Sequence, residues 1–475
     1  MTGNEKRETR IYNIIAEVCS FIIGSCEESF FVKFSCVSYG EMQRIYGIIH
    51  ERISILFEPE SNETDKGKMN SIRHLKRVDL DNVFFDNVEK LSVELKSSGD
   101  YFALMGLVQV FDEALEELLK DKISELQKND FSVVLNTNRE STGIGLLPRC
   151  SCMWERKHRL AHSYNRMDCF LFNILLIENS ILGDLIDKHF FLKNDSFPDL
   201  LSKRKLKIAT TPLRVDRHFA FERFEEKSIL YFRVVYDRNK FDEDNNLIWD
   251  KIIAASKNDC DIILFPELLG NPQTVSFVCD KLKALSNGER QRMPSMIILP
   301  SFSENKRNTV AIVDREGNVI CSQFKQNPFR DPKGNSGYLE DITSNKVVNI
   351  FHFEGIGRIT ILICKDFLTT KYMEQLMRCF KLTLIIVPSF STGSYDFRRS
   401  FDLCAHDDCN VVWINACAAF EEGKEENFKY IGYVRKRVSR TDDEAQRLCG
   451  MPICEGAFTG GCRQDCLFYD TIQGV

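Results

Sequence analysis

Three short apolar runs in the second half of the chain each lead into a reactive side chain. Glu267 follows the run at 261–265 in the string LFPELLG, Lys325 closes CSQFK, and Cys364 ends ITILIC. Runs of this length and composition predict strands. A carboxylate, an amine and a thiol at the ends of neighbouring strands can meet at one edge of a folded sheet. That set suffices for acyl transfer through a covalent thioester, because a carboxylate can move the protons of a thiol nucleophile.

The order Glu, Lys, Cys and the residues around it resemble the nitrilase (carbon–nitrogen hydrolase) superfamily. Further matches are the Phe-Pro pair before Glu267, Asp366 after the Cys, and the stretch DFRRSFDLCAHDDCNVVWINAC, which is similar to the family's helix and the strand behind its active site. The resemblance covers about residues 206–475. It implies an α/β fold in the form of a four-layer α-β-β-α sandwich. We expect no cofactor and no metal ion.

The resemblance also assigns roles to residues. Cys364 would attack the carbon of an amide or nitrile, Glu267 would be the general base and later the general acid, and Lys325 would stabilise the oxyanion with the backbone N–H of Lys365. Glu340, in SGYLED, could be the family's additional carboxylate that holds the Lys, although the loop before it can be aligned in more than one way. We also expect Lys325 to lower the pKa of Cys364, so that this thiol reacts faster with iodoacetamide than most of the other cysteines.

The chain departs from the family pattern near the expected pocket. After the Cys-x-Asp the family usually has an Arg, whereas this sequence continues FLTT. The stretch before Glu267 carries extra residues, including ILYFRVVYDRNKFDED. The expected partner is therefore a small-molecule amide or nitrile whose identity stays open.

Length and composition limit the number of domains and the class of protein that the chain can form. At 475 residues, 43% hydrophobic and 28% charged, the chain predicts an ordinary globular protein with two domains. The first residues, MTGNEKRETR, lack the apolar core of a signal peptide, and no apolar run reaches the ~20 residues of a membrane span. We expect a cytoplasmic protein without membrane contact, whose many cysteines are mostly reduced, buried and inert. The net charge of −6 argues against a protein that binds nucleic acid over its whole surface. Basic spots at 156–159 and 435–437 leave nucleic-acid binding open, although a solvated face is favoured for both.

We expect a mostly helical domain at residues 1–197 and the nitrilase-like domain at 206–475. Helical periodicity predicts a helix over 101–127 with Asp100 as its N-cap, and a second over 164–189. The charged stretch 193–205, which contains Pro198, is the expected boundary. Because the first domain shows no convincing set of reactive residues, we expect it to bind a protein partner or to mediate assembly.

From residue 206 onward, short β-rich runs alternate with helical ones, which predicts sheets buried under helices. Turn signals at 314–318 and 354–357 predict hairpins. The expected helices are 244–256, 370–380 and 394–408. The expected strands are 207–211, 261–265, 295–300, 309–313, 319–324, 348–353, 358–364, 382–388, 411–415 and 466–471.

Other interpretations of the whole chain stay open. One is a catalytically silent binding or scaffold module that keeps the fold. Another is the nitrilase component of an antiphage defence system, because nitrilase-like domains joined to a helical region resemble those attached to bacterial reverse transcriptases; this chain has no Tyr-x-Asp-Asp polymerase signature. We also expect a homo-oligomer, paired through an apolar stripe formed by Tyr372, Met373, Leu376, Met377 and Phe380.

Two further patterns are weaker. Cys449, Cys454, Cys462 and Cys466 lie close in sequence and could bind zinc, but they lack the tight Cys-x2-Cys pairs of most structural sites. The string RKHRLAH at 156–162 loosely fits the Arg and His spacing of small helical ribonucleases, and a solvated helix face is favoured there.

Overall fold

The computed structural model describes residues 3–58, 71–129, 131, 134–155, 165–198, 200–331, 337–405, 408–421, 425–437, 446–459 and 461–474. The chain divides into two compact units. The first unit comprises Met1–Cys150 and Arg156–Gly183, and the second comprises Ser151–Glu155 and Asp184–Val475.

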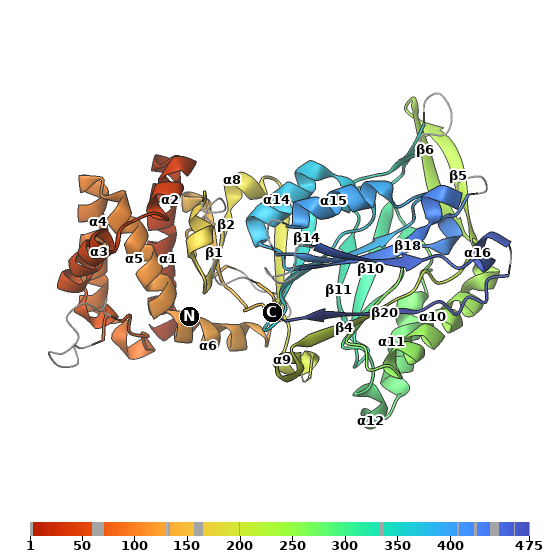
Figure 1. Cartoon of the computed structure of the whole chain (residues 1–475), viewed down its shortest axis with the longest axis horizontal. Helices are drawn as coiled ribbons and strands as arrows, with labels where there is room; N and C mark the ends of the chain where they lie inside the picture. Colours follow the sequence, from red (N-terminus) through yellow and green to blue (C-terminus); the bar gives the residue numbers. More distant parts are fainter. Residues whose placement is uncertain are drawn as a thin grey trace. The chain divides into compact units, whose positions relative to one another are not determined.

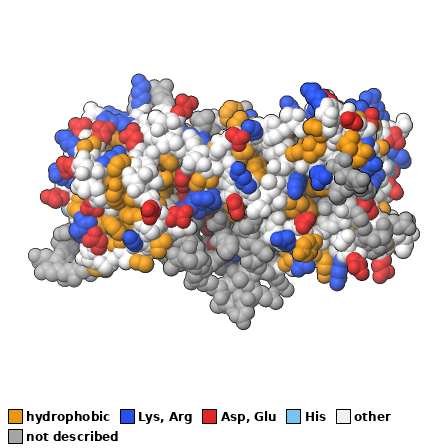
Figure 2. Space-filling view, turned by 90° about the horizontal axis from the view of Figure 1, so that it is seen from above, with side chains coloured by type: hydrophobic (Ala, Val, Ile, Leu, Met, Phe, Trp, Pro, Cys, Tyr) orange, Lys and Arg blue, Asp and Glu red, His pale blue; other side chains and the backbone are white. Residues whose placement is uncertain are grey.

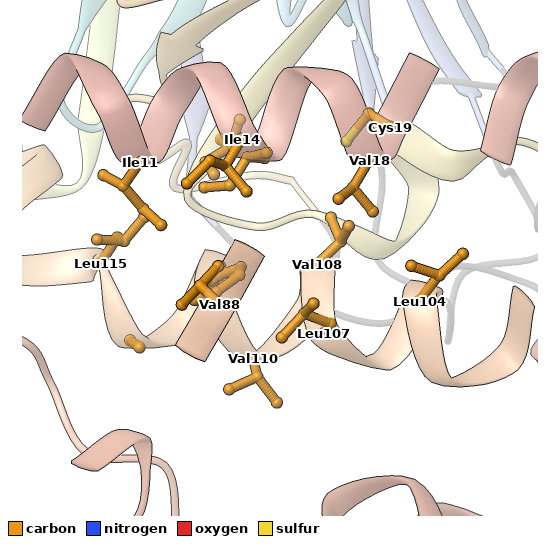
Figure 3. Close-up of a cluster of buried hydrophobic side chains, with 14 of the residues drawn as sticks. Ile11, Ile14, Val18, Cys19, Val88, Leu104, Leu107, Val108, Val110 and Leu115 are labelled. Carbon is orange, nitrogen blue, oxygen red and sulfur yellow. The ribbon is translucent and has the colours of Figure 1, made fainter. Parts of the chain in front are cut away.

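The first unit is built from helices around one apolar core. Asp100 caps helix α5, since its carboxylate accepts a hydrogen bond from the N–H of Ala103 at 3.0 Å. The helix expected over 101–127 is instead two helices that meet at Leu115. Figure 3 shows side chains of α1, α4 and α5 meeting in the core, among them Ile14, Val88 and Val108. The main elements are α1 (Gly3–Ser25), α2 (Glu28–Phe34), α3 (Tyr39–Arg52), α4 (Asn82–Ser98), α5 (Tyr101–Ala114), α6 (Glu116–Leu126) and the antiparallel pair β1 (Ile144–Pro148) and β2 (Ile174–Glu178).

The helix expected over 164–189 is wrong. Its described part contains a 3-10 turn, strand β2, the one-turn helix α8 (Asn179–Leu182) and strand β3 (Ile186–Phe191). Gly183, at φ +63°, follows α8 and ends it. Strand β3 then pairs in parallel with β14 (Val347–Phe353) of the second unit. Gly183 is the last residue of the first unit, so the second unit already includes the stretch 193–205 that was expected to be the boundary.

The second unit contains two large sheets and one small one. The first large sheet has the order β11-β10-β8-β7-β4-β20, with β9 beside β10, and the second has the order β19-β18-β17-β16-β15-β14-β3. The small sheet has the order β12-β13-β6-β5. The strand bounds are β4 (Lys205–Thr210), β5 (Phe219–Glu226), β6 (Ile229–Tyr236), β7 (Ile262–Leu264), β8 (Met296–Ile298), β9 (Phe302–Glu304), β10 (Arg307–Asp314), β11 (Val319–Phe324), β12 (Arg330–Asp331), β13 (Tyr338–Glu340), β15 (Gly357–Ile361), β16 (Leu384–Ser389), β17 (Asn410–Asn415), β18 (Tyr430–Arg437), β19 (Gln446–Pro452) and β20 (Phe468–Gln473).

Helices cover these sheets from two sides. Figure 1 shows α14 (Thr370–Phe380) and α15 (Tyr395–Ala405) on one side of the large sheets, and α10 (Phe241–Ser256) and α11 (Thr274–Ala284) on the other. Strands β7, β16 and β17 are buried at every residue, as their continuous apolar sequences predict. The second unit therefore has an α/β fold. Each strand expected between 206 and 475 overlaps an observed strand, whereas β5, β6, β9, β12, β13, β18 and β19 were not expected.

Both predicted hairpin turns are present. Strands β10 and β11 are joined through Asp314–Asn318, where the N–H of Asp314 donates to the carbonyl of Asn318 at 3.0 Å. Strands β14 and β15 meet at Gly357, which has φ +88°. A Cβ at Gly357 would lie 2.8 Å from Oγ1 of Thr383, so this close approach requires glycine.

The apolar stripe of α14 is not an open surface. Tyr372, Met373, Leu376, Met377 and Phe380 are all buried within the chain, and the Phe380 ring packs edge-on against His189 of β3. The interface proposed from this stripe is therefore wrong, because the second unit already covers it. The expectation of a homo-oligomer stays a prediction.

The basic spot at 435–437 is also internal. Arg435 is buried and donates to the carbonyl of Cys409, Lys436 pairs with Asp470, and Arg437 pairs with Asp408. A solvated face was therefore the wrong interpretation there. The string at 156–162 lies outside the described residues. On the face drawn in Figure 2, cationic and anionic side chains are interspersed. Within the described ranges, no helix is both long and apolar enough to cross a membrane.

Candidate active site

Glu267, Lys325, Glu340 and Cys364 come together around one cavity of the second unit. The cavity has a volume of about 140 Å³, and all four residues line it. Each is almost fully buried, with exposed fractions of 1%, 3%, 5% and 4% respectively. The four residues that the sequence predicts for the site thus lie together, although they are spread over about a hundred positions of the chain.

Strand ends and one strained turn position these side chains. Lys325 directly follows β11, Glu340 ends β13, and Glu267 lies just beyond β7. Cys364 lies between β15 and the short helix α13 (Lys365–Leu368), with φ +47° and ψ −100°. A non-glycine residue in such a region costs about 1–3 kcal/mol, and strain of this kind concentrates at functional sites. The turn is held by a hydrogen bond from the N–H of Cys364 to the carbonyl of Pro388 at 2.9 Å.

The ammonium group of Lys325 lies between two carboxylates. Its Nζ donates to Oε1 of Glu267 at 2.8 Å and to Oε2 of Glu340 at 2.6 Å. Burial acts to lower the pKa of Lys325, but the two carboxylates outweigh it and raise that pKa well above its ordinary value. Lys325 is therefore a fixed cation at neutral pH.

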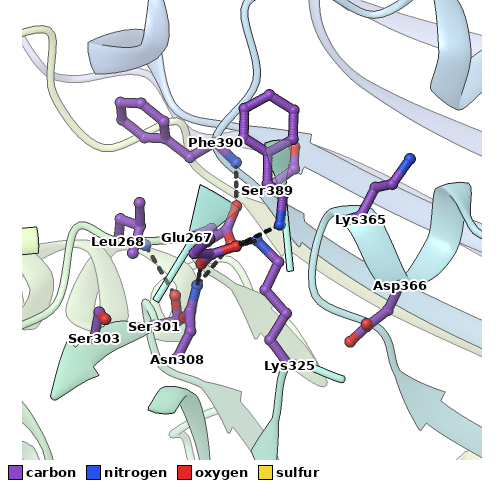
Figure 4. A network of polar contacts seen from close by, with 12 residues as sticks. Glu267, Leu268, Ser301, Ser303, Asn308, Lys325, Lys365, Asp366, Ser389 and Phe390 are labelled. Atoms are coloured by element: carbon purple, nitrogen blue, oxygen red, sulfur yellow. Dashed lines mark hydrogen bonds and ion pairs between the residues drawn. The ribbon is translucent and has the colours of Figure 1, made fainter. Parts of the chain in front are cut away.

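Asn308 completes this network and was not predicted from the sequence. Its Nδ2 donates to Oε1 of Glu267 at 2.8 Å and to Oε1 of Glu340 at 3.2 Å. The N–H of Phe390 donates to Oε2 of Glu267 at 2.8 Å, as Figure 4 shows. A signal was available: Asn308 is a polar residue at the start of the apolar strand β10, next to Lys325 across the hairpin, where the N–H of Lys325 donates to its carbonyl at 2.9 Å.

The Cys364 side chain is a thiol with a base beside it. Burial and the Glu267 carboxylate raise the pKa of Cys364 well above its ordinary value, and Lys325 offsets only part of this. Burial also raises the pKa of Glu267, and the positive charge of Lys325 offsets part of this rise. The expectation that Lys325 gives Cys364 a low pKa is therefore wrong. Any attack by this sulfur must be accompanied by proton transfer to Glu267.

Asp366 fixes the turn after Cys364 to the loop after Lys325. Its carboxylate accepts hydrogen bonds from the N–H of Gln326 at 3.0 Å and the N–H of Asn327 at 2.8 Å, and from Nδ2 of Asn327 at 2.9 Å. Burial raises the pKa of Asp366 to about 7. The neighbouring Lys365 is the first residue of α13, where a backbone N–H has no acceptor within the helix and can face a developing oxyanion.

The extra residues before Glu267 form part of the cavity wall. Strands β5 and β6 contribute Phe221 and Phe232, whose rings pack edge to face at 5.4 Å, and Phe221 also contacts Phe390. Arg217 lies at the rim, with its guanidinium 5.5 Å from the Phe390 ring. The other lining residues are Arg223, Leu268, Phe329, Asp331, Ser391, Thr392 and Glu421. An apolar aromatic wall with a few charged groups suits a small organic ligand.

No family model matches this chain, and no curated protein matches it. Among solved structures, it is similar to a cysteine-to-alanine mutant of the amidase from Nesterenkonia sp. AN1 in complex with butyramide, at 16% identity over 46% of this chain and 78% of that one, with a TM-score of 0.31. It is also similar to the C. elegans NitFhit protein, at 14% identity over 57% of this chain and 61% of that one, with a TM-score of 0.36.

Proposed function

We propose that the second unit is a nitrilase-type α-β-β-α sandwich that hydrolyses a carbon–nitrogen bond of a small amide or nitrile through a thioester on Cys364. The observation that carries this proposal is the buried network in which Lys325 joins Glu267 and Glu340 beside the Cys364 thiol, at a cavity of about 140 Å³. Burying charged groups costs folding free energy, and strained residues concentrate at functional sites. A cluster of buried charged groups beside the strained Cys364 therefore favours a catalytic role.

For an amide, the first step forms a bond between Sγ of Cys364 and the carbonyl carbon. The thiol proton passes to Glu267, and the electron pair of the carbonyl moves onto its oxygen. We assign the stabilisation of that oxyanion to Lys325 and the N–H of Lys365, a contribution on the order of 10²–10³ in rate for one such donor. Because the thiol starts protonated, Glu267 is required for this step.

The second half of the reaction returns the site to its starting state. The tetrahedral intermediate collapses, the carbon–nitrogen bond breaks, and the leaving amine takes the proton from Glu267. A water molecule then gives a proton to Glu267 while its oxygen attacks the thioester carbon. The carbon–sulfur bond breaks, the acid is released, and the sulfur regains its proton from Glu267.

A catalytically silent binding module is the second candidate, and the raised pKa of Cys364 is the observation that favours it. The two candidates differ in turnover. We expect Cys364→Ala to abolish hydrolysis of any amide or nitrile that the wild-type protein hydrolyses. The matched control is Cys321→Ala, which removes a half-buried thiol of β11 that does not line the cavity. Equal activity of the Cys364→Ala variant and the wild type would reject the hydrolase proposal.

A further inference from the structure

Among the described residues, three cationic side chains line the cavity of the candidate active site, and they differ in their partners. The ammonium group of Lys325 is held between two carboxylates. Arg223, on β5, pairs with Asp331 at 3.5 Å. Arg217 donates to two backbone carbonyls and forms no ion pair with a carboxylate in the described parts of the chain. Arg217 is therefore the cavity cation that is best placed to bind an anionic ligand.

The guanidinium group of Arg217 is fixed along one of its edges. Its Nε donates to the carbonyl of Ala418 at 2.5 Å, and its Nη2 donates to the carbonyl of Phe420 at 3.2 Å. The guanidinium carbon lies over the ring of Phe390, 5.5 Å from its centre. An arginine side chain has five N–H donors in a rigid planar fork. The other edge, formed by Nη1 and the second N–H of Nη2, therefore offers the parallel pair of donors that a carboxylate accepts best.

The position of Arg217 suits an anion that comes from the ligand. Arg217 is exposed at the rim of the cavity, so a ligand can reach it. Burial lowers the pKa of Arg217, and the charge of Glu421, which also lines the cavity, acts in the opposite direction. Because attraction between charges strengthens as water is removed, an anionic group gains more at this partly dehydrated guanidinium than at a fully hydrated one. Glu421 is the charge with which such a group competes.

An apolar wall connects the rim to the reactive groups. The N–H of Phe390 donates to Oε2 of Glu267 at 2.8 Å, as Figure 4 shows, whereas its ring lies under Arg217. The rings of Phe221 and Phe232 continue this wall, since Phe221 lies 6.1 Å from Phe390 and 5.4 Å from Phe232. A ligand that reaches from Glu267 to Arg217 therefore passes an apolar surface about as long as one phenylalanine side chain.

The small sheet holds this wall beside the reactive carboxylates. Strand β13 pairs in parallel with β6, with Glu340 opposite Phe232. The N–H of Asp341 donates to the carbonyl of Phe232 at 2.9 Å. Strands β5 and β6, which Figure 1 labels, belong to the stretch before Glu267 in which the chain carries extra residues. The wall is therefore built largely from the part of the sequence that departs from the family pattern.

We propose that the ligand of this cavity is a small amide or nitrile whose acyl part joins an apolar body to a terminal carboxylate. The reacting carbon lies at Cys364, the apolar body lies against Phe221, Phe232 and Phe390, and the carboxylate binds the outer edge of Arg217. The carboxylate belongs to the acyl part because a nitrile carries no second group on its nitrogen. This assignment of a substrate class rests on the proposed function.

The test is ligand binding to the full-length Cys364→Ala protein, which binds the probes without turnover. The anionic probes are para-carboxyphenylacetamide and the half-amides of dicarboxylic acids of increasing chain length. Each is compared by calorimetry with the neutral amide that carries a methyl group in place of the carboxylate. At least one anionic probe should bind about 10–100-fold more tightly than its neutral counterpart, as expected for charge-assisted hydrogen bonds.

Two further substitutions in the Cys364→Ala protein assign that preference to one residue. Arg217→Met keeps an unbranched side chain without the charge and should remove most of the preference. Arg223→Met is the matched control and should keep the preference, because it removes a cavity cation that already pairs with Asp331. Equal loss in both variants, or equal affinity of every anionic probe and its neutral counterpart, would overturn the proposal.

A second measurement covers the case in which Arg217→Met fails to fold. Added sodium chloride should weaken the binding of an anionic probe to the Cys364→Ala protein and leave that of its neutral counterpart unchanged, because salt screens exposed charges. Equal salt dependence of the two would also overturn the proposal. Failure of the hydrolase proposal looks different, since the preference for anionic probes would persist while the wild-type protein hydrolyses none of them. Hydrolysis without that preference would reject the substrate class alone.

Discussion

The side-chain amide of Asn308 donates a 2.8 Å hydrogen bond to Oε1 of Glu267, the same oxygen atom that accepts from Lys325. Two donors therefore engage Oε1. The other carboxylate oxygen, Oε2, accepts a hydrogen bond from the N–H of Phe390, and its second lone pair can still accept a proton. In the proposed mechanism Asn308 therefore acts through Glu267: it orients the carboxylate so that Oε2 can serve as the base for Cys364.

Replacing Asn308 tests this positioning role. Asn308→Ala should lower kcat about 10–100-fold, because a buried carboxylate loses a donor worth about 1–3 kcal/mol. The pH dependence of kcat should move as well, since the pKa of Glu267 rises further without this donor. Asn308→Gln is the conservative comparison. If the pH profile is unchanged and only the fraction of folded protein falls, Asn308 has a structural role and does not position Glu267.

The alkylation rate of Cys364 tests the electrostatics without any substrate. Because the pKa of this thiol is raised by burial and by Glu267, iodoacetamide should modify Cys364 slowly at pH 7. The rate should increase by about tenfold per pH unit up to pH 9, as the thiolate fraction rises. Peptide-resolved mass spectrometry gives the rate for this cysteine alone, with Cys321 as an internal reference.

Two substitutions should change that rate in opposite directions. Glu267→Gln removes a negative charge that raises the pKa of Cys364, so alkylation at pH 7 should become several-fold faster while turnover is lost. Lys325→Met removes the cation that offsets the rise, so alkylation should slow. If both variants alkylate at the wild-type rate, the charges of this network do not act on the sulfur.

Glu340 should matter less than Glu267. It holds Lys325 at 2.6 Å, and the proposed mechanism gives it no part in moving the proton of Cys364. We expect Glu340→Gln to retain measurable turnover, lowered by about 10–100-fold through the loss of one charged hydrogen bond to Lys325. Kinetic assays of the two Gln variants in parallel separate the roles, and complete loss in both would show that the carboxylates act as one unit.

Asp366 predicts a pH dependence of stability. Its pKa of about 7 in the folded protein lies above the unfolded value of about 3.9, so folding favours the protonated form. The stability that this group contributes is present below about pH 4 and is lost as the pH rises through 7, by an amount on the order of a few kcal/mol. Urea unfolding monitored from pH 4 to 8 should lose part of its pH dependence in Asp366→Asn. The control, Asp396→Asn on the exposed face of α15, should leave the pH dependence unchanged.

Much of the second unit could be predicted from the sequence because its strands are short apolar runs bounded by turn residues. Val319–Phe324 is a strand over the expected residues, and Lys325 lies directly after it as predicted. The run at 174–177 misled the prediction because apolar β-branched and Leu residues suit a buried strand or a buried helix equally well. Pairing decides such cases, here the register between β1 and β2, and a single sequence does not show it.

The candidate site was harder to complete than to locate. Spacing along the chain brought out Glu267, Lys325 and Cys364, but Asn308 is recognised as part of the site only when distant strands meet. The direction of the pKa shift of Cys364 also escaped prediction. It depends on how deeply the sulfur is buried and on which charge is nearer, and neither follows from residue types alone.

The most direct test of the central claim is mass spectrometry of the Cys364 peptide after rapid acid quench of the full-length protein mixed with a library of small amides and nitriles. A thioester on Cys364 should add the mass of an acyl group to this peptide. In Glu267→Gln, any adduct that forms should persist longer. In the control Cys364→Ser, the peptide should carry no acyl group, although the same measurement would detect an ester. Turnover of a library member with no acyl adduct on Cys364 at any quench time, or with an adduct on another cysteine, would contradict the account.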